Sequence, residues 1–119
     1  MFEKASENDA AMFDIDDTLI FINGRPNVPI INLLHRMKAL GYKIIIITAR
    51  PGFKMVVDYT MKQLADHGIT YDYLGFTSAQ TKGVMKQQLG YNFVLSVGDM
   101  PTDWTNSTYY INTSNSYHS

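Results

Sequence analysis

Short apolar runs alternate along the chain with longer segments in which apolar residues recur at every third or fourth position. The runs predict five strands, at residues 10–13, 43–47, 73–76, 93–97 and 108–111. Residues 44–47 are four consecutive isoleucines, a run too short for a helix. Because β-branched side chains favour extended chain, this run indicates a strand that is buried on both faces.

The segments between these runs have helical spacing. Helices are predicted at residues 29–40, 53–66 and 81–89, with a short helical turn within 100–106. Pro29 can begin the first helix, because its missing N–H is not needed in a first turn. Gly41, Gly68 and Gly90 are expected to end the three helices. A tight hairpin is predicted at 19–26, with Asn-Gly at residues 23–24 in a type I′ turn.

The alternation of buried strands and helices predicts an α/β protein. The expected fold is Rossmann-like, with three layers (α/β/α), a central parallel sheet of about five strands and right-handed crossovers. The 119 residues suffice for a single domain spanning 1–119. A short polar segment at 1–9 and a loose tail at 112–119 are expected to flank it.

Composition narrows the range of functions. The 10 basic and 11 acidic residues give a net charge of −1, which provides no overall basic field toward nucleic acid and leaves room for a local patch. The absence of cysteine rules out disulfides and thiolate chemistry. Residues 1–9 lack the apolar segment of a secretory signal, and no apolar run approaches the length of a membrane span. The expected location is the cytoplasm, with no membrane partner.

Polar residues follow three of the predicted strands. They are Asp14-Ile15-Asp16-Asp17-Thr18 after the first, Thr48-Ala49-Arg50 after the second, and Gly98-Asp99-Met100-Pro101-Thr102-Asp103 after the fourth. Lys82 stands near the start of the helix before the fourth strand. In sheets of this type, ligands bind at the carboxyl ends of the strands, so these residues are candidates for one site.

The residue types in these sets suit phosphate chemistry with a metal ion. Asp14 and Asp16 are two positions apart and would share one face of a strand. Carboxylates held this close repel one another unless a cation joins them, and oxygen ligands suit Mg²⁺. A lysine and a threonine are the donors that such a site needs for phosphate oxygens.

The four sets resemble the motifs of the haloacid dehalogenase-like superfamily, and specifically its phosphatase branch. That superfamily has Asp-x-Asp-x-Thr, a Ser or Thr ending an apolar strand, a Lys near a helix start, and often Gly-Asp-x-x-x-Asp. The matching residues, in order, are Asp14, Asp16 and Thr18, then Thr48, then Lys82, then Gly98, Asp99 and Asp103. The resemblance runs from about residue 10 to residue 111, nearly the whole chain.

The resemblance implies a role for each matched residue. Asp14 would attack phosphorus and form an aspartyl-phosphate, while Asp16 would act as general acid and then as general base. An Asp at this second position favours a phosphatase over a dehalogenase. The substrate-binding set would be Thr18, Thr48, Arg50 and Lys82, and Lys82 would also restrain Asp14. Mg²⁺ would be held by Asp14, the backbone carbonyl of Asp16, Asp99 and Asp103.

Several neighbouring positions leave a choice open. Asp17 stands where many members carry Gly, as it does in some phosphatase branches. Lys86 competes with Lys82 as the catalytic lysine, and Lys82 is preferred because it lies at the helix start. Lys86 is then expected to be a solvated charge. Arg50 would hold a substrate group or pair with a carboxylate, and the sequence favours neither. Trp104 is expected in the core or the cleft wall, with stacking on a base as the less favoured alternative.

No segment is long enough for a cap domain, since residues 18–48 and 48–82 hold little beyond the predicted elements. The chain therefore resembles the capless polynucleotide 3′-phosphatase and class B acid phosphatase branches. The hairpin resembles the family's flap, which would place residues 21–25 over the site. An uncapped cleft would admit a phosphate on a nucleic-acid end or a protein side chain. It would also admit a small ester if a neighbouring copy in a homo-oligomer closes the site.

The leading hypothesis is a Mg²⁺-dependent phosphatase acting on phosphate monoesters through an aspartyl-phosphate. The alternative is a catalytically silent module of the same fold that binds phosphate or nucleotide, although an intact Asp16 argues against it. A phosphoacceptor receiver domain is rejected by motif order. No Asp ends the third predicted strand, and a second acidic pair follows Lys82.

Overall fold

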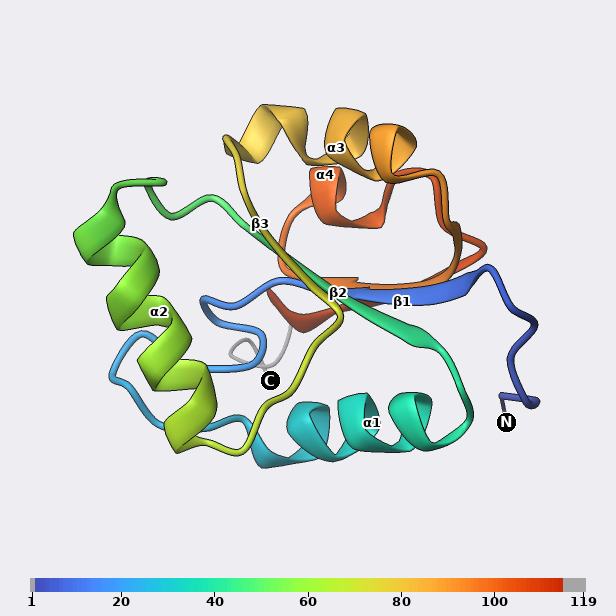
Figure 1. The fold of residues 1–119 in the computed structure, drawn as a ribbon, viewed down its shortest axis with the longest axis horizontal. Helices are drawn as coiled ribbons and strands as arrows, with labels where there is room; N and C mark the ends of the chain where they lie inside the picture. Colours follow the sequence, from blue (N-terminus) through green and yellow to red (C-terminus); the bar gives the residue numbers. More distant parts are fainter. Residues whose placement is uncertain (1, 115–119) are drawn as a thin grey trace.

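The computed structural model describes residues 2–114. Its elements are β1 (Asp9–Phe13), α1 (Val28–Ala39), β2 (Lys43–Thr48), α2 (Lys54–Asp66), β3 (Tyr73–Phe76), a 3-10 helix (Ala79–Thr81), α3 (Lys82–Leu89), β4 (Asn92–Gly98), α4 (Pro101–Trp104) and β5 (Tyr109–Asn112). The five strands pair in parallel in the order β3-β2-β1-β4-β5 (Figure 1). The predicted Rossmann-like α/β fold is confirmed.

Helices cover both faces of the sheet. α1 lies on one face, and α3 and α4 lie on the other (Figure 1). The central strands β1 and β2 contribute to a core on each side: Phe13 and Ile46 pack toward α1 and α2, whereas Met12 and Ile45 pack toward α3. Burying one such side chain stabilises the fold by about 2 kcal/mol, so the isoleucine run anchors the sheet as the sequence predicts.

The hairpin after β1 differs in detail from its prediction. The Phe21 N–H donates to the Arg25 carbonyl, and the Gly24 N–H donates to the Phe21 carbonyl, each at 2.8 Å. Only Gly24 of the loop has a positive φ, at 86°. The loop is therefore a three-residue turn that ends in a left-handed glycine, and the predicted type I′ turn is wrong.

The C-terminal part of the body extends beyond its predicted end. Asn112 closes β5, and Thr113 is buried with its hydroxyl 3.2 Å from that of Thr18. Residues 112–114 therefore belong to the folded body, and residues 115–119 of the predicted tail lie outside the described residues. At the other end, Phe2 packs against the core, so the polar N-terminal segment is partly anchored. Among the described residues, no helix is long and apolar enough to cross a bilayer.

Candidate active site

Asp14 stands where β1 leaves the sheet. Its backbone N–H donates to the Val97 carbonyl of β4 at 2.9 Å, which fixes the chain at this point. Its side-chain Oδ1 accepts from the Ile15 N–H at 2.8 Å and from Lys82 Nζ at 2.9 Å. Burial raises the pKa of Asp14 to about 7, and the opposing charge of Lys82 offsets only part of this effect. A buried carboxyl that titrates near neutrality is a feature of functional sites.

The ammonium of Lys82 lies between two carboxylates. Lys82 is the first residue of α3. Its Nζ is 2.9 Å from Asp14 Oδ1 and 2.7 Å from Asp103 Oδ1, and all three side chains are buried. Burial alone would lower the pKa of Lys82, but the charges of Asp14 and Asp103 outweigh it and raise that pKa. When Asp14 is ionised, one lysine shared by two carboxylates leaves the group net negative, which suits a further cation.

Three carboxylates form an acidic cluster at the carboxyl ends of β1 and β4. Asp14, Asp99 and Asp103 each offer an oxygen within 4.8 Å of the others, and together they could hold a metal ion. A donor set made only of carboxylate oxygens fits a hard divalent cation such as Mg²⁺. Gly98 makes the arrangement feasible, because a Cβ at this position would collide with the Asp103 carboxyl.

Asp103 is held from two directions. Lys82 binds its Oδ1, and the backbone N–H of Met100 donates to its Oδ2 at 3.1 Å. The second contact fixes the short loop between β4 and α4, which also carries Asp99. The last motif of the sequence therefore folds back on itself and presents both carboxylates to Asp14.

Asp16 points to a different partner. Arg50 binds it through two contacts, Nη2 to Oδ1 at 2.8 Å and Nε to Oδ2 at 3.1 Å. The remaining Arg50 nitrogen, Nη1, donates to Thr60 Oγ1 and to Gln63 Oε1 of α2. Of the two readings for Arg50, this structure has the pairing with a carboxylate. The Asp16 carboxylate is outside the acidic cluster. The role of the Asp16 backbone carbonyl as a metal ligand stays a prediction.

The two predicted threonines are both buried, with different surroundings. Thr48 ends β2, and its Oγ1 accepts from the Arg50 N–H at 3.1 Å. The Thr18 hydroxyl contacts Thr113 of the C-terminal body, as described above. Immediately before Thr18, Asp17 adopts φ 57°, a left-handed conformation that glycine takes readily and aspartate tolerates. This explains how Asp can stand where many members of the resembled family carry Gly.

The prediction that Lys86 is a solvated charge is wrong. Lys86 is 1% exposed, and its Nζ donates to the carbonyls of Asp103 at 2.9 Å and Thr105 at 2.5 Å. It also reaches the hydroxyls of Ser96 at 2.8 Å and Ser107 at 3.0 Å. Lys86 therefore joins α3, β4 and the segment after α4, without touching the carboxylates themselves. Burial lowers its pKa to about 8.

The burial of Lys86 could have been predicted from the helical periodicity of α3. Residues four apart lie on one face of a helix, so a Lys82 that faces the site places Lys86 on the same face. A charged residue at that position needs buried acceptors. The serines and free carbonyls of residues 96–107 supply them, but they come from a distant part of the sequence.

Of the comparisons with known proteins, the one with solved structures supports the fold. No protein-family model matches the chain, and neither does any curated protein sequence. Solved structures are similar: a chain in "Structure of Pnkp1/Rnl/Hen1 complex" has a TM-score of 0.67 and 24% identity over 86% of this chain. A chain in "Structure of the Pnkp1/Rnl/Hen1 RNA repair complex" has a TM-score of 0.65 and 25% identity over 86%. This chain spans 42% and 39% of those two chains.

Proposed function

We propose that the protein is a Mg²⁺-dependent phosphatase that hydrolyses phosphate monoesters through an aspartyl-phosphate at Asp14. The single observation that carries the proposal is the contact of Lys82 with both Asp14 and Asp103. It supplies a carboxylate nucleophile, a fixed positive charge beside it and further carboxylates for a cation in one buried group. Phosphoryl transfer needs mainly this combination of positioning and charge neutralisation.

Mg²⁺ would lie against Asp14, Asp99 and Asp103, with the carbonyl of Asp16 as the fourth ligand that the sequence suggests. When bound, it would neutralise charge on the phosphate oxygens and allow the carboxylate form of Asp14 to predominate. Thr48, at the end of β2, would donate its hydroxyl to a phosphate oxygen. Thr18 as a substrate ligand stays a prediction.

The first step transfers the phosphoryl group to the protein. Both hydrogen bonds described for the Asp14 carboxyl end on Oδ1, which leaves Oδ2 as the attacking oxygen. The bond from Oδ2 to phosphorus forms as the ester bond of the substrate breaks. Asp16 gives its proton to the departing oxygen, and Lys82 restrains the Asp14 carboxylate during the attack.

The second step releases phosphate. Asp16, now a carboxylate, takes a proton from a water molecule that attacks the phosphorus, and the bond to Asp14 breaks. Asp16 is suited to both steps, because its side chain is 48% exposed and can exchange protons with water. Arg50 binds both oxygens of this carboxylate, so the oxygen that carries the proton has to leave its contact, while the other oxygen stays bound to Arg50 and keeps Asp16 oriented.

We further propose that the phosphate is carried by the end of a nucleic acid or by a nucleotide. In the described part of the chain, residues 18–48 and 48–82 hold no segment long enough for a cap, so a large phosphorylated body would reach the cluster. The similar chain that is 25% identical comes from a structure described as "Structure of the Pnkp1/Rnl/Hen1 RNA repair complex", which favours a nucleic-acid end over a protein side chain. The alternative of a silent binding module would keep the same contacts and lack turnover.

The test is release of inorganic phosphate from an aryl phosphate and from a 3′-phosphorylated oligonucleotide. Each would be measured with Mg²⁺ and with a chelator, for the native chain and for Asp14→Asn. We expect release only with both Mg²⁺ and Asp14, and a higher kcat/KM for the oligonucleotide. Binding of the oligonucleotide without any release would favour the silent module instead.

A further inference from the structure

Trp104 and Tyr110 stack on one another at the edge of the sheet. Their ring centroids are 4.8 Å apart, and their planes differ by 22°. Tyr110 belongs to the edge strand β5, opposite Ser96 of β4. Ser96 binds Lys86 of α3, so Tyr110 also faces the α3 and α4 side of the sheet.

The indole is fixed close to the acidic cluster. Trp104 follows Asp103 directly, and its Nε1 donates to the Gly98 carbonyl at 3.0 Å. Gly98 in turn precedes Asp99. The ring is therefore tied to the segments that carry two of the three clustered carboxylates, and Tyr110, stacked on it, needs little further ordering to contact a ligand.

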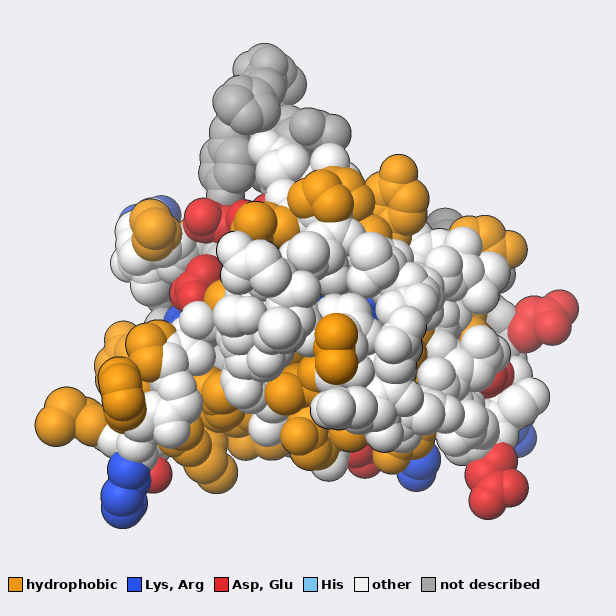
Figure 2. Space-filling view, turned by 90° about the horizontal axis from the view of Figure 1, so that it is seen from above, with side chains coloured by type: hydrophobic (Ala, Val, Ile, Leu, Met, Phe, Trp, Pro, Cys, Tyr) orange, Lys and Arg blue, Asp and Glu red, His pale blue; other side chains and the backbone are white. Residues whose placement is uncertain are grey.

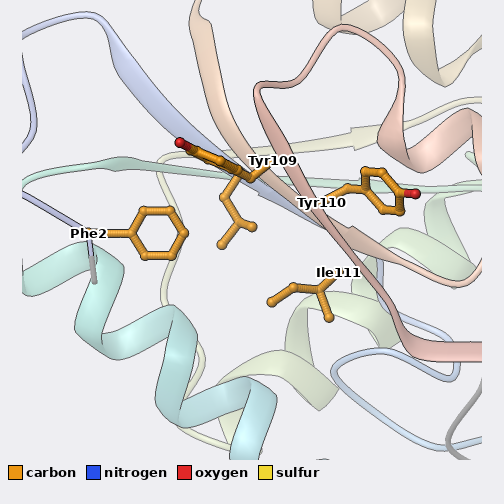
Figure 3. A pocket seen from close by; sticks show the side chains of 5 residues that line it. Phe2, Tyr109, Tyr110 and Ile111 are labelled. Carbon is orange, nitrogen blue, oxygen red and sulfur yellow. The ribbon is translucent and has the colours of Figure 1, made fainter.

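Tyr110 offers an open aromatic face. Its residue is 59% exposed although one face of its ring is covered by the indole, so the opposite face is accessible to solvent. Tyr109 is equally exposed but points the other way, toward Phe2 at a ring-centroid distance of 6.2 Å (Figure 3). Tyr109 and Tyr110 both line a pocket of about 350 Å³ with Phe2, Leu95 and Ile111, but the Tyr110 ring points away from Phe2 (Figure 3).

The charges of the protein provide little electrostatic attraction for a nucleic acid. The net charge is −1, and in the view of the α3 face the visible Lys and Arg side chains lie mainly at its margins and form no patch there (Figure 2). Binding through phosphates alone would be weak and sensitive to salt. Stacking on an aromatic ring supplies affinity for any base, because every base has a π-face.

We infer that Tyr110, backed by Trp104, is a shelf on which a nucleobase near the phosphorylated end of the substrate stacks. The inference rests on the proposed function and assigns a second contact to the same substrate. The base lies over Tyr110 while the terminal phosphate reaches Asp14. Recognition by stacking makes the protein select nucleotide-bearing phosphates without selecting among base sequences.

Fluorescence tests the shelf without requiring turnover, because Trp104 is the only tryptophan in the chain. The Asp14→Asn protein would be titrated with a 3′-phosphorylated oligonucleotide and with one of the same length that lacks its last bases. A mononucleotide would be titrated as a third ligand, to show whether the protein binds free nucleotides as well as polynucleotide ends. We expect quenching by ligands that carry a base near the phosphate. Equal responses to base-bearing and abasic ends, or no response to either, would overturn the inference.

Kinetics provide a second test with a matched control. In the native protein the base-bearing end is expected to have a KM about tenfold below that of the abasic end. Tyr110→Ala should remove this preference, Tyr110→Phe should keep it, and Tyr109→Ala, on the opposite face of the same strand, should keep it too. A preference that survives Tyr110→Ala would refute the shelf, while hydrolysis of aryl phosphate would still report separately on the proposed chemistry.

Discussion

Arg50 binds Asp16 through two nitrogen–oxygen contacts, Nη2 to Oδ1 at 2.8 Å and Nε to Oδ2 at 3.1 Å. The planar guanidinium matches the carboxylate, and the same side chain is tied to α2 through Thr60 and Gln63. The arginine that follows β2 therefore sets the direction in which the residue proposed as general acid and base can point.

Arg50→Lys should lower kcat more than it changes KM. A lysine carries the same charge but cannot make two parallel contacts, so Asp16 would lose its fixed orientation. Asp16 is about half exposed, but the Arg50 side chain is only 13% exposed and also donates to Thr60 and Gln63, so the cost in stability should be about 1 to 2 kcal/mol. Steady-state kinetics and urea unfolding measure both quantities.

Lys62→Ala is the matched control for this variant. Lys62 lies on α2, the helix that Arg50 contacts, in an exposed pair with Asp66, and its substitution should leave kcat and KM as they are. If Arg50→Lys instead raised KM with kcat intact, Arg50 would be a substrate ligand and its contact with Asp16 incidental.

Lys86→Met should destabilise the protein by about 3 kcal/mol. The substitution keeps an unbranched side chain only one atom shorter but leaves the carbonyls of Asp103 and Thr105 buried without their donor. The segment that carries Asp103 should loosen, and affinity for Mg²⁺ should fall with it. Urea unfolding and calorimetric titration with Mg²⁺ would measure the two effects.

Gln87→Met introduces the same side chain at the neighbouring exposed position of α3 and should be nearly neutral. A Lys86→Met protein as stable as Gln87→Met would show that the buried ammonium has no structural role. If the Lys86→Met protein were destabilised but kept its full affinity for Mg²⁺, the contacts of Lys86 would stabilise the fold without positioning the acidic cluster.

The raised pKa of Asp14 predicts a pH dependence for the metal-free protein. Its pKa is 3.8 when unfolded and about 7 when folded, so the folded state binds more protons between these values. The contribution of Asp14 to stability should therefore fall as pH rises from about 4 to about 7. Unfolding free energies in chelator, compared between native and Asp14→Asn proteins, isolate this contribution.

The same shift predicts how Mg²⁺ stabilises the protein. The cation binds the carboxylate form of Asp14, so the increase in melting temperature on adding Mg²⁺ should grow with pH up to about 7 and then level off. An increase that is the same at pH 5 and pH 8 would show that Asp14 takes no part in binding the ion.

Residues whose role follows from local pattern were predictable from the sequence. The isoleucine run gave β2, the glycine after residue 89 ended α3, and the rule that sites lie at strand ends brought Asp14, Asp99 and Asp103 together. These predictions depend on one strand or helix at a time, with the parallel sheet as the only long-range assumption.

Contacts between distant side chains were not predictable in the same way. Lys86 looked like a surface charge because its acceptors are carbonyls and hydroxyls, which every segment contains. The pairing of Thr18 with Thr113 joins residues far apart in the chain, and nothing near either one indicates it. The choice of Arg50 between a carboxylate and a substrate group depended on where α2 lies, which periodicity alone does not give.

The central claim is that Asp14 becomes phosphorylated during turnover, and capture of that intermediate tests it most directly. The protein would be mixed with substrate and Mg²⁺, quenched in acid and treated with borohydride, which reduces an acyl phosphate to an alcohol. Mass spectrometry of the peptide that contains residue 14 then locates the change. We predict a reduced side chain at Asp14 that is absent without Mg²⁺ or substrate. Phosphate release with an unmodified Asp14, or with the label on another residue, would contradict the account.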